Sequence, residues 1–364
     1  MHSCDVLIAG GGPAGSSCAW ALRSSGLHVL IVDKATFPRN KVCGGWITPW
    51  VLEALQIDAE EYARSRTMQK IRGFHVGSLG ARGNDVSYDH PVSYGIRRCE
   101  FDEYLLRRSG AETREGEAIH RIERSGEDWI INGEIKTRLL IGAGGHFCPV
   151  ARRLGNANSD QPVVAQEIEF EMSSDQASSC SVQPEIPELY FCRDFQGYGW
   201  CFRKENFLNI GLGRLDQHAL SFHVSDFLKF LRATGKVAFD LPGKLSGHAY
   251  LLFGYGHRKL VDDSVMLVGD AAGLAFPQSG EGIRPAVESG LLAAEVIEAA
   301  EGNYGREQLA AYSDVLKKTV GNGAGSSTGP VAYVPGWLRN NIARFLFGTQ
   351  WFCRRIVVEN WFLR

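Results

Sequence analysis

The sequence lacks any closely spaced pair of cysteines of the kind that holds a metal or a redox centre. Its nine cysteines are scattered over 364 residues, and no two of them form a C-x-x-C motif. An odd number of cysteines without a disulfide framework is typical of a reducing compartment. We therefore expect a cytoplasmic protein with free cysteines and no bound metal.

Long hydrophobic runs and a strong net charge are also absent. No uninterrupted apolar run reaches the roughly 18 residues of a membrane-spanning helix, and the formal net charge is only −2. We therefore expect neither a membrane span nor a nucleic-acid partner. The chain begins at its first predicted strand, so no signal peptide is expected. A length of 364 residues favours two domains.

What the sequence does contain is a glycine-rich turn inside a β-α-β unit. Residues 5–9 form an apolar run of strand type, and the glycine-rich segment GGGPAG follows at 10–15. Residues 16–25 are expected to form a helix and 29–32 a second strand, which ends in Asp33. A G-x-G-x-x-G turn between strand and helix, followed by an acid at the next strand end, is typical of a dinucleotide-binding fold.

Each of these positions has a physical task. Gly10 makes the tight turn, Gly12 lets a pyrophosphate approach the backbone, and Gly15 lets the helix lie close to the strand. The free N–H groups at the helix start bind the diphosphate. Asp33 is placed to accept hydrogen bonds from ribose hydroxyls. The alternative is a glycine-rich turn that binds nothing.

Residues 37–45, Phe-Pro-Arg-Asn-Lys-Val-Cys-Gly-Gly, are expected to form a loop because of their proline and glycines. Arg39 and Lys41 precede the Cys-Gly-Gly turn at 43–45. One interpretation is a backbone loop that lies against a flat ring system, with the cations facing phosphate or ring oxygens. The other is a solvated basic turn with a packed cysteine, and spacing alone does not separate the two.

The middle of the chain alternates between segments of two kinds. Arg98 opens a predicted helix and is either an anion ligand or a surface arginine. The remaining expected elements are a helix over 47–62, short strands over 71–94, a hairpin over 117–131, a buried strand at 139–141 and, over 163–253, short strands interrupted by a helix at 224–234.

Three aromatic residues share one side of a predicted strand. Tyr198, Trp200 and Phe202 lie at a period of two, so their side chains point to the same face. They form either a core stripe or an aromatic-lined pocket for an apolar substrate.

A second ligand-facing turn is predicted near the end of the chain. The apolar run 264–268 leads to Asp270, and the glycine-rich segment 277–283 precedes a small-residue helix over 284–300. An acid at the end of a buried strand followed by such a turn faces a ligand in open α/β sheets. The helix start at Gly282 offers free N–H groups to a negative group.

The tail over 336–364 differs in composition from the rest. It contains Trp337, Trp351 and Trp361 and five arginines, against the single acid Glu359. This basic, aromatic segment is expected to be helical and either to dock on the body or to lie on a membrane surface.

The order of these motifs resembles the FAD-dependent geranylgeranyl reductase family, within the larger group of p-hydroxybenzoate-hydroxylase-like flavoproteins. The resemblance runs from residue 5 to about residue 300, and its most specific parts are FPRNKVCGG at 37–45 and PQSGEGI at 277–283. It implies non-covalently bound FAD. The cofactor-binding residues that it implies are Gly10, Gly12, Pro13, Ala14, Gly15, Asp33, Lys34, Lys41, Cys43, Gly44, Gly45, Arg98, Ala118, Gly269, Asp270, Gly280, Gly282 and Ile283.

The same resemblance implies the fold class and its boundaries. We expect an α/β protein with a Rossmann-like FAD-binding domain, an α+β substrate domain built on an antiparallel sheet, and a C-terminal helical tail. The expected boundaries are 1–70, 98–160 and 255–310 for the FAD-binding domain, 71–97 and 161–254 for the substrate domain, and 311–364 for the tail.

For function, the resemblance implies reduction of carbon–carbon double bonds in an isoprenoid or other apolar lipid. Cys43, Tyr198 and Trp200 are the expected catalytic residues, and Tyr198, Trp200 and Phe202 the substrate-binding ones. NADPH, NADH or a ferredoxin-like protein would be the transient reductant. Membrane contact, where present, would go through the tail, and the oligomeric state is left open.

The alternatives are a monooxygenase or halogenase of the same fold, or a flavin-binding protein without chemistry. The related group of flavoproteins usually has Asp-Gly where this chain has Gly144-Gly145, and this difference argues against a hydroxylase. Halogenases of the relevant type would carry Trp-x-Trp-x-Ile-Pro, whereas this chain has Tyr-Gly-Trp-Cys-Phe at 198–202.

Overall fold

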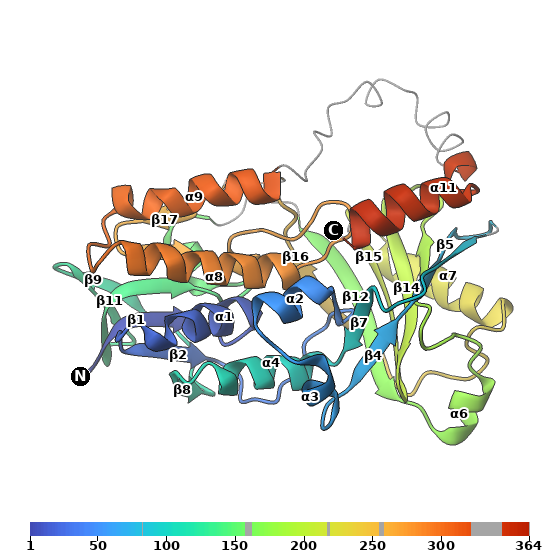
Figure 1. Cartoon of the computed structure of the whole chain (residues 1–364), viewed down its shortest axis with the longest axis horizontal. Helices are drawn as coiled ribbons and strands as arrows, with labels where there is room; N and C mark the ends of the chain where they lie inside the picture. The colour runs from blue at the N-terminus through green and yellow to red at the C-terminus, as the bar shows by residue number, and fades with distance from the viewer. Residues whose placement is uncertain (82, 157–161, 217–218, 255–257, 322–343, 364) are drawn as a thin grey trace. The chain divides into compact units, whose positions relative to one another are not determined.

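The computed structural model groups the chain into two compact units, which Figure 1 shows as one ribbon. It describes residues 1–363 except 82, 157–161, 217–218, 255–257 and 322–343. Unit 1 consists of Met1–Asn40, Cys99–Gln161 and Tyr250–Gly325; unit 2 consists of Lys41–Arg98, Pro162–Ala249 and Ser326–Arg364.

These boundaries differ most from the expected ones in two places. Residues 41–70 belong to unit 2 rather than to the nucleotide-binding unit, because β3 (Trp46–Ile47) and β4 (Met68–Ile71) both pair with β7 (Ser93–Ile96). The segment 311–364 is not one tail, since α9 (Arg306–Gly321) is part of unit 1 and the described remainder is part of unit 2.

Unit 1 is built on an eight-stranded sheet with a parallel centre. The parallel strands follow the order β18-β11-β1-β2-β8, and β17, β10 and β9 add antiparallel neighbours. The central strand has side chains buried on both faces, as in sheets covered by helices on both sides. The strands are β1 (His2–Ala9), β2 (Val29–Asp33), β8 (Glu112–Glu115), β9 (Ile122–Ser125), β10 (Asp128–Ile131), β11 (Ile135–Gly142), β17 (Val261–Asp262) and β18 (Val265–Leu267).

Two helices of unit 1, α1 and α8, lie side by side (Figure 1). A Cβ at Gly290 in α8 would lie 2.3 Å from the carbonyl oxygen of Ala14 in α1, so only glycine permits this close approach. The helix predicted over 16–25 begins earlier, at Pro13, because proline suits the first helical turn. The helical elements are α1 (Pro13–Ala21), η1 (Leu22–Ser24), α4 (Arg98–Arg108), α5 (Pro149–Arg153), η2 (Gly269–Ala271), α8 (Ile283–Ala299) and α9.

Unit 2 contains a seven-stranded, mostly antiparallel sheet and the three-stranded sheet β3-β7-β4. The strands of the large sheet, in spatial order, are β16 (Ser246–Tyr250), β12 (Val163–Glu171), β15 (Phe207–Arg214), β14 (Gly197–Lys204), β13 (Glu188–Phe191), β5 (Gly73–Ser78) and β6 (Asn84–Ser87). The helices are α2 (Pro49–Ala54), α3 (Ala59–Ala63), α6 (Ser174–Ser179) and α7 (Leu220–Ala233).

The prediction of a single helix over 47–62 is wrong. This segment forms two short helices, α2 and α3, separated by a turn in which Gln56 adopts a positive φ of 52°. Asp58 then caps α3 by accepting a hydrogen bond from the Glu61 N–H at 2.8 Å. A left-handed residue followed by a new N-cap ends one helix and starts another.

The two faces of the large sheet have different partners. The face with Cys201, Ile210 and Tyr190 packs in a hydrophobic cluster with Phe227 of α7. The opposite face carries the even-numbered residues of β14, including the predicted aromatic stripe, because side chains alternate along a strand.

The described part of the tail packs on unit 2. The ring of Phe362, at the end of η4 (Cys353–Phe362), stacks on Trp46 with centroids 5.1 Å apart. The Asn84 side chain donates to the Phe347 carbonyl at 2.8 Å, and Phe347 packs on Phe191. The short α11 (Gln350–Phe352) precedes η4, whereas Trp337 and Arg339 lie outside the described residues. Among the described helices, none has the length and apolar character to span a bilayer.

Candidate active site

The turn between β1 and α1 has a shape that only glycine allows. Gly10 has a φ of +122°, and a Cβ there would lie 2.5 Å from the Ala143 carbonyl oxygen. A Cβ at Gly15 would lie 2.0 Å from the Gly10 carbonyl oxygen. Gly12 is the N-cap of α1, and no side chain of the described residues caps this helix. Its first N–H groups are therefore available to an anion.

Asp33 closes this turn from the next strand. Its Oδ2 accepts a hydrogen bond from the Gly11 N–H, and its Oδ1 accepts one from the Ala35 N–H, both at 2.8 Å. The carboxylate is half-buried, so its remaining lone pairs are accessible to a ribose. Lys34 and Ala118, two other predicted cofactor residues, are exposed near the same strand end.

Arg39 adds a cation beside the turn. Its Nη2 lies 3.4 Å from the position of a Cβ on Gly12, and the same guanidinium pairs with the buried Asp102 at 3.2 Å. The sequence left open whether this arginine faces phosphate, and it was not among the predicted cofactor residues. Its position next to Gly12 favours the phosphate-facing interpretation.

A second turn of unit 1 brings Asp270 to the start of α8. Gly269 has a φ of +60°, and its N–H donates to the Ser289 hydroxyl at 2.9 Å. The Asp270 Oδ1 lies 3.2 Å from the position of a Cβ on Gly282, the N-cap of α8, which no described side chain caps. Unit 1 therefore has two adjacent helices, α1 and α8, that both begin at a glycine without a side-chain cap.

Glu281 is a functional candidate that the sequence prediction missed. It lies between Gly280 and Gly282 of the second turn, and its Oε1 is buried with no hydrogen bond inside the described structure. Burial raises the pKa of this carboxyl to about 8, and the nearby Arg284 opposes the shift. A carboxyl that is protonated near neutral pH can donate a hydrogen bond or a proton.

In unit 2, the Cys43-Gly44-Gly45 turn rests on the large sheet. The Cys43 N–H donates to the Glu167 carboxylate, and the Asn209 side chain donates to the Cys43 carbonyl at 3.5 Å. A Cβ on Gly44 would lie 3.7 Å from the Phe202 ring and 3.8 Å from the Trp200 Nε1. The structure thus brings the predicted ring-facing turn and two residues of the aromatic stripe together.

A polar network anchors this aromatic face. The Trp200 Nε1 donates to the Asn209 Oδ1 at 2.7 Å, and Asn209 in turn donates to Glu169 at 3.1 Å. Glu169 also forms an ion pair with the buried Lys204. The third predicted aromatic, Tyr198, contacts Phe362 with centroids 5.5 Å apart.

Glu167, on β12, is a second buried acid that the sequence prediction missed. Burial raises the pKa of its carboxyl to about 7, and Lys204 opposes the shift. Its Oε2 forms no hydrogen bond within the described residues. The alternating segment Glu-Ile-Glu-Phe-Glu at 167–171 was the available signal, since it places acids on the face that carries the aromatic stripe.

Two predicted basic cofactor ligands are also found in unit 2. The Lys41 Nζ lies 2.5 Å from the His248 Nε2 on β16, and Arg98 is buried at the start of α4. The roles assigned to these residues by resemblance remain predictions.

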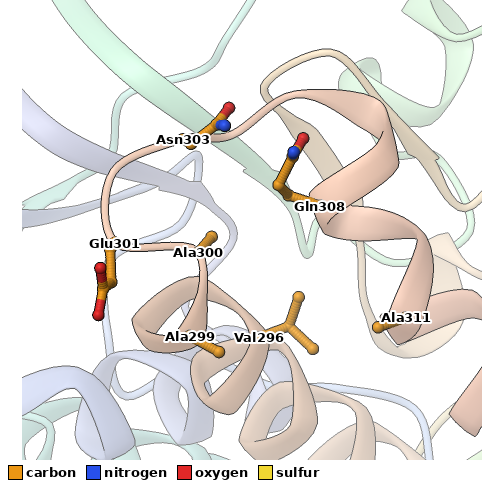
Figure 2. A pocket seen from close by; sticks show the side chains of 7 residues that line it. All are labelled: Val296, Ala299, Ala300, Glu301, Asn303, Gln308 and Ala311. Carbon is orange, nitrogen blue, oxygen red and sulfur yellow. The ribbon is translucent and has the colours of Figure 1, made fainter.

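A hollow of about 450 Å³ lies elsewhere in unit 1 (Figure 2). Its lining side chains come from the C-terminal end of α8 and from α9. The cofactor motif precedes the opposite end of α8, and a helix of 17 residues is about 25 Å long. This hollow is therefore separate from the predicted cofactor site. It is lined by Val296, Ala299, Ala300, Glu301, Asn303, Gln308 and Ala311.

Comparison with known proteins gives the class of this chain. Residues 8–61 match the family model of an NAD(P)-binding Rossmann-like domain. Digeranylgeranylglycerophospholipid reductase 3 of Methanosphaera stadtmanae is 29% identical over 341 residues, covering 87% of this chain and 83% of that protein. Menaquinone reductase of Mycobacterium tuberculosis is 28% identical over 323 residues, covering 81% and 77%.

Solved structures share the fold. A geranylgeranyl bacteriochlorophyll reductase-like protein from Thermoplasma acidophilum has a TM-score of 0.74 at 21% identity, with 96% of this chain and 88% of that one covered. A halogenase in complex with FAD has a TM-score of 0.67 at 19% identity, with coverages of 87% and 74%. The chain thus has the fold of an FAD-binding oxidoreductase.

The resemblance to geranylgeranyl reductases that the motifs indicated is confirmed as well. This chain is similar over most of its length to geranylgeranyl and menaquinone reductases, as its motifs indicated. The residues of unit 1 fit FAD, because the two uncapped helix starts, the open Gly12 and Arg39 suit a diphosphate, and Asp33 suits a ribose.

Replacement of Asp33 tests the ribose contact. Asp33→Ala should weaken FAD binding about ten- to a hundredfold, because a hydrogen bond to a charged group contributes roughly 1.5–3 kcal/mol. Asp33→Asn retains one acceptor oxygen, so its affinity for FAD should lie between those of the parent protein and Asp33→Ala. Affinity is measured by flavin fluorescence on adding FAD to the apoprotein. An unchanged dissociation constant in Asp33→Ala would exclude a ribose contact.

The buried Glu281 predicts a dependence of stability on pH. Its folded pKa of about 8 lies above the ordinary 4.5, so between these values the folded protein holds a proton that the unfolded chain has released. The free energy of unfolding therefore falls as the pH rises through this window. Glu281→Gln should remove that part of the slope and be more stable than the parent above pH 8, as measured by urea unfolding. Glu123→Gln, on an exposed hairpin, should follow the parent curve.

Proposed function

We propose that this protein is an FAD-dependent reductase of carbon–carbon double bonds in an isoprenoid or similar apolar lipid. The observation that carries the proposal is the Cys43–Gly45 turn, which lies on a sheet face formed by Trp200 and Phe202. The names of its sequence relatives, which include digeranylgeranylglycerophospholipid reductases, support the same substrate class.

Bound FAD supplies the hydride chemistry. The protein contributes binding and position. The N–H groups at the start of α1 and the Arg39 guanidinium bind the diphosphate, and Asp33 binds the ribose. Gly45 has a φ of +64°, and a Cβ there would lie 2.2 Å from the Ile96 carbonyl oxygen, so glycine lets this turn lie close against the strands of unit 2.

Trp200 and Phe202 hold the apolar chain by removing its surface from water, at about 25 cal/mol per Å². Reduction of a double bond needs a hydride on one carbon and a proton on the other. We assign proton delivery to the Cys43 thiol, the titratable side chain of the turn, whose main chain is held by Glu167 and Asn209.

A monooxygenase or halogenase is the alternative, because a probable FAD-dependent monooxygenase from Pseudomonas aeruginosa shares the fold with a TM-score of 0.67. The Gly144-Gly145 pair and the Tyr-Gly-Trp-Cys-Phe segment at 198–202 both favour the reductase.

The electron donor is NADPH, NADH or a ferredoxin-like protein that binds transiently.

We also propose that the tail contacts the membrane that contains the lipid. Phe345 and Trp351 are 73% and 65% exposed, and Arg355 lies exposed nearby in the sequence. Aromatic and basic side chains together bind anionic lipid surfaces. This contact would act alongside the packing of Phe347 and Phe362 on unit 2.

The reaction is tested by mixing the reduced enzyme with a geranylgeranyl lipid in an anaerobic stopped-flow instrument, followed by mass analysis. The flavin should be reoxidised without oxygen and the product should gain two hydrogens per reduced bond. Trp200→Ala should raise KM about ten- to a hundredfold, as expected for losing about 1.5–3 kcal/mol of buried side chain, and should retain FAD.

Trp200→Phe is the matched control for this test, since it keeps a ring but loses the bond to Asn209, and it should retain most of the affinity. Cys43→Ala should reduce the lipid more slowly or reduce fewer of its double bonds, and it should still bind FAD. Flavin that stays reduced until oxygen is admitted, with a product heavier by one oxygen, would indicate a monooxygenase instead.

Membrane contact is tested by co-sedimentation with anionic vesicles at low salt. The parent protein should sediment with them, and the double variant Phe345→Ala/Trp351→Ala should bind at least severalfold less. Phe222→Ala is the control, because this phenylalanine of α7 is 67% exposed at a distant point of the sequence. Equal binding of all three proteins, or no binding of the parent, would contradict the proposed contact.

A further inference from the structure

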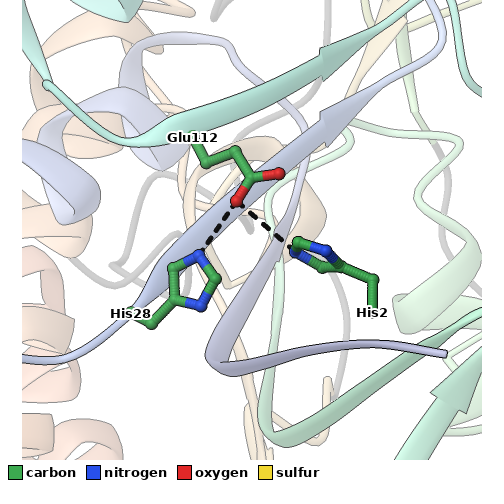
Figure 3. Close-up of side chains that lie close together, drawn as sticks. All are labelled: His2, His28 and Glu112. Atoms are coloured by element: carbon green, nitrogen blue, oxygen red, sulfur yellow. Dashed lines mark hydrogen bonds and ion pairs between the residues drawn. The ribbon is translucent and has the colours of Figure 1, made fainter.

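Three potential metal ligands meet at one edge of the sheet of unit 1. The His28 Nε2 lies 2.9 Å from the Glu112 Oε2, and the His2 Nε2 lies 3.4 Å from the same oxygen. One ligand atom from each residue lies within 4.8 Å of the other two. Figure 3 shows both imidazole rings turned toward this one carboxylate oxygen.

The fold fixes this arrangement from three separate strands. His2 begins β1, His28 immediately precedes β2, and Glu112 begins β8. These strands are parallel neighbours in the order β1-β2-β8, so their amino ends lie at the same edge. The backbone of His28 is further held by Asp5, which exchanges hydrogen bonds with it at 2.9 and 3.0 Å. A ligand set on paired strands needs little ordering when it binds an ion.

The distances suit a tetrahedral ion. Zinc binds imidazole nitrogen and carboxylate oxygen at about 2.0–2.2 Å, so two ligand atoms of a tetrahedral site lie about 3.3–3.5 Å apart. The two separations from the Glu112 oxygen, 2.9 and 3.4 Å, are close to these values, and the two histidine nitrogens lie within 4.8 Å of each other. Two histidines and one glutamate, with water as the fourth ligand, form a known type of zinc site.

An imidazole–carboxylate ion pair alone explains only part of this geometry. The hydrogen bond from His28 lowers the pKa of the Glu112 carboxyl, which favours a charged acceptor. The His2 Nε2, however, is buried and forms no hydrogen bond with any described residue. A buried polar nitrogen without a hydrogen bond is costly, and a bound cation would remove that cost.

We propose that His2, His28 and Glu112 bind one Zn²⁺ ion at the amino ends of β1, β2 and β8. The glycine-rich turn follows the opposite end of β1, and eight residues of strand span about 26 Å. The ion therefore stabilises the nucleotide-binding unit by joining three strands, and takes no part in the reaction. No metal was predicted from the sequence because these ligands are far apart in it, with Glu112 84 positions after His28.

The test uses the untagged, full-length holoenzyme, stripped with a chelator and then dialysed against Zn²⁺. Elemental analysis after gel filtration should find one zinc ion per chain. His2→Ala, His28→Ala and Glu112→Gln should each weaken zinc binding at least tenfold. Zinc should raise the melting temperature of the parent protein by several degrees and that of His28→Ala by none.

His120→Ala is the matched control, since His120 is an exposed histidine of the same unit, and it should bind zinc like the parent. Because free cysteines also bind zinc, Co²⁺ is used as a second probe, and its visible spectrum should lack a thiolate band. Zinc content unchanged in His28→Ala, or no retained zinc in the parent, would overturn the proposal. FAD content and lipid reduction are measured separately, so either proposal can fail without the other.

Discussion

The close approach of backbone to backbone around the β1–α1 turn is the constraint on which the rest of unit 1 depends. A side chain at Gly10, Gly15 or Gly290 would overlap a carbonyl oxygen, so β1, β11, α1 and α8 can meet only where glycine stands. This contact aligns α1 and α8, and both begin at glycines without a side-chain cap. The same lack of side chains that permits the packing leaves N–H groups for an anionic cofactor. Packing and cofactor recognition thus have one cause.

In unit 2 the corresponding constraint is the alternation of side chains along the large sheet. One face packs on α7 through apolar residues such as Ile210 and Cys201. The other face gathers Trp200, Phe202, Glu167 and Asn209 beneath the Cys43 turn, in an arrangement too polar for an ordinary core. Burying a carboxyl such as that of Glu167 costs stability, as its raised pKa indicates. Such a cost is typical of a functional face, and it supports the assignment of chemistry to this turn.

Much of the fold could be predicted from residues close together in the chain. The β-α-β unit, the helix of α8 and the stripe at Tyr198, Trp200 and Phe202 follow from local periodicity and glycine spacing, and the structure contains all of them. The predicted helix over 47–62 failed because its middle adopts a left-handed turn at Gln56, which apolar periodicity does not reveal. The assignment of 41–70 to the nucleotide-binding domain differed because strand pairing with β7 joins this segment to unit 2.

The sequence by itself determined the class of protein, because a glycine motif, an acid at a strand end and two specific loops are local patterns with local physical causes. Only the tertiary structure decided which side chains meet. Glu167 and Asn209 come from β12 and β15 to hold the Cys43 turn, and Glu281 becomes an acid with a raised pKa only through burial. His2, His28 and Glu112 likewise converge only because parallel pairing brings three strand ends to one edge. Desolvation and strand register arise from contacts between distant residues, and no local pattern encodes them.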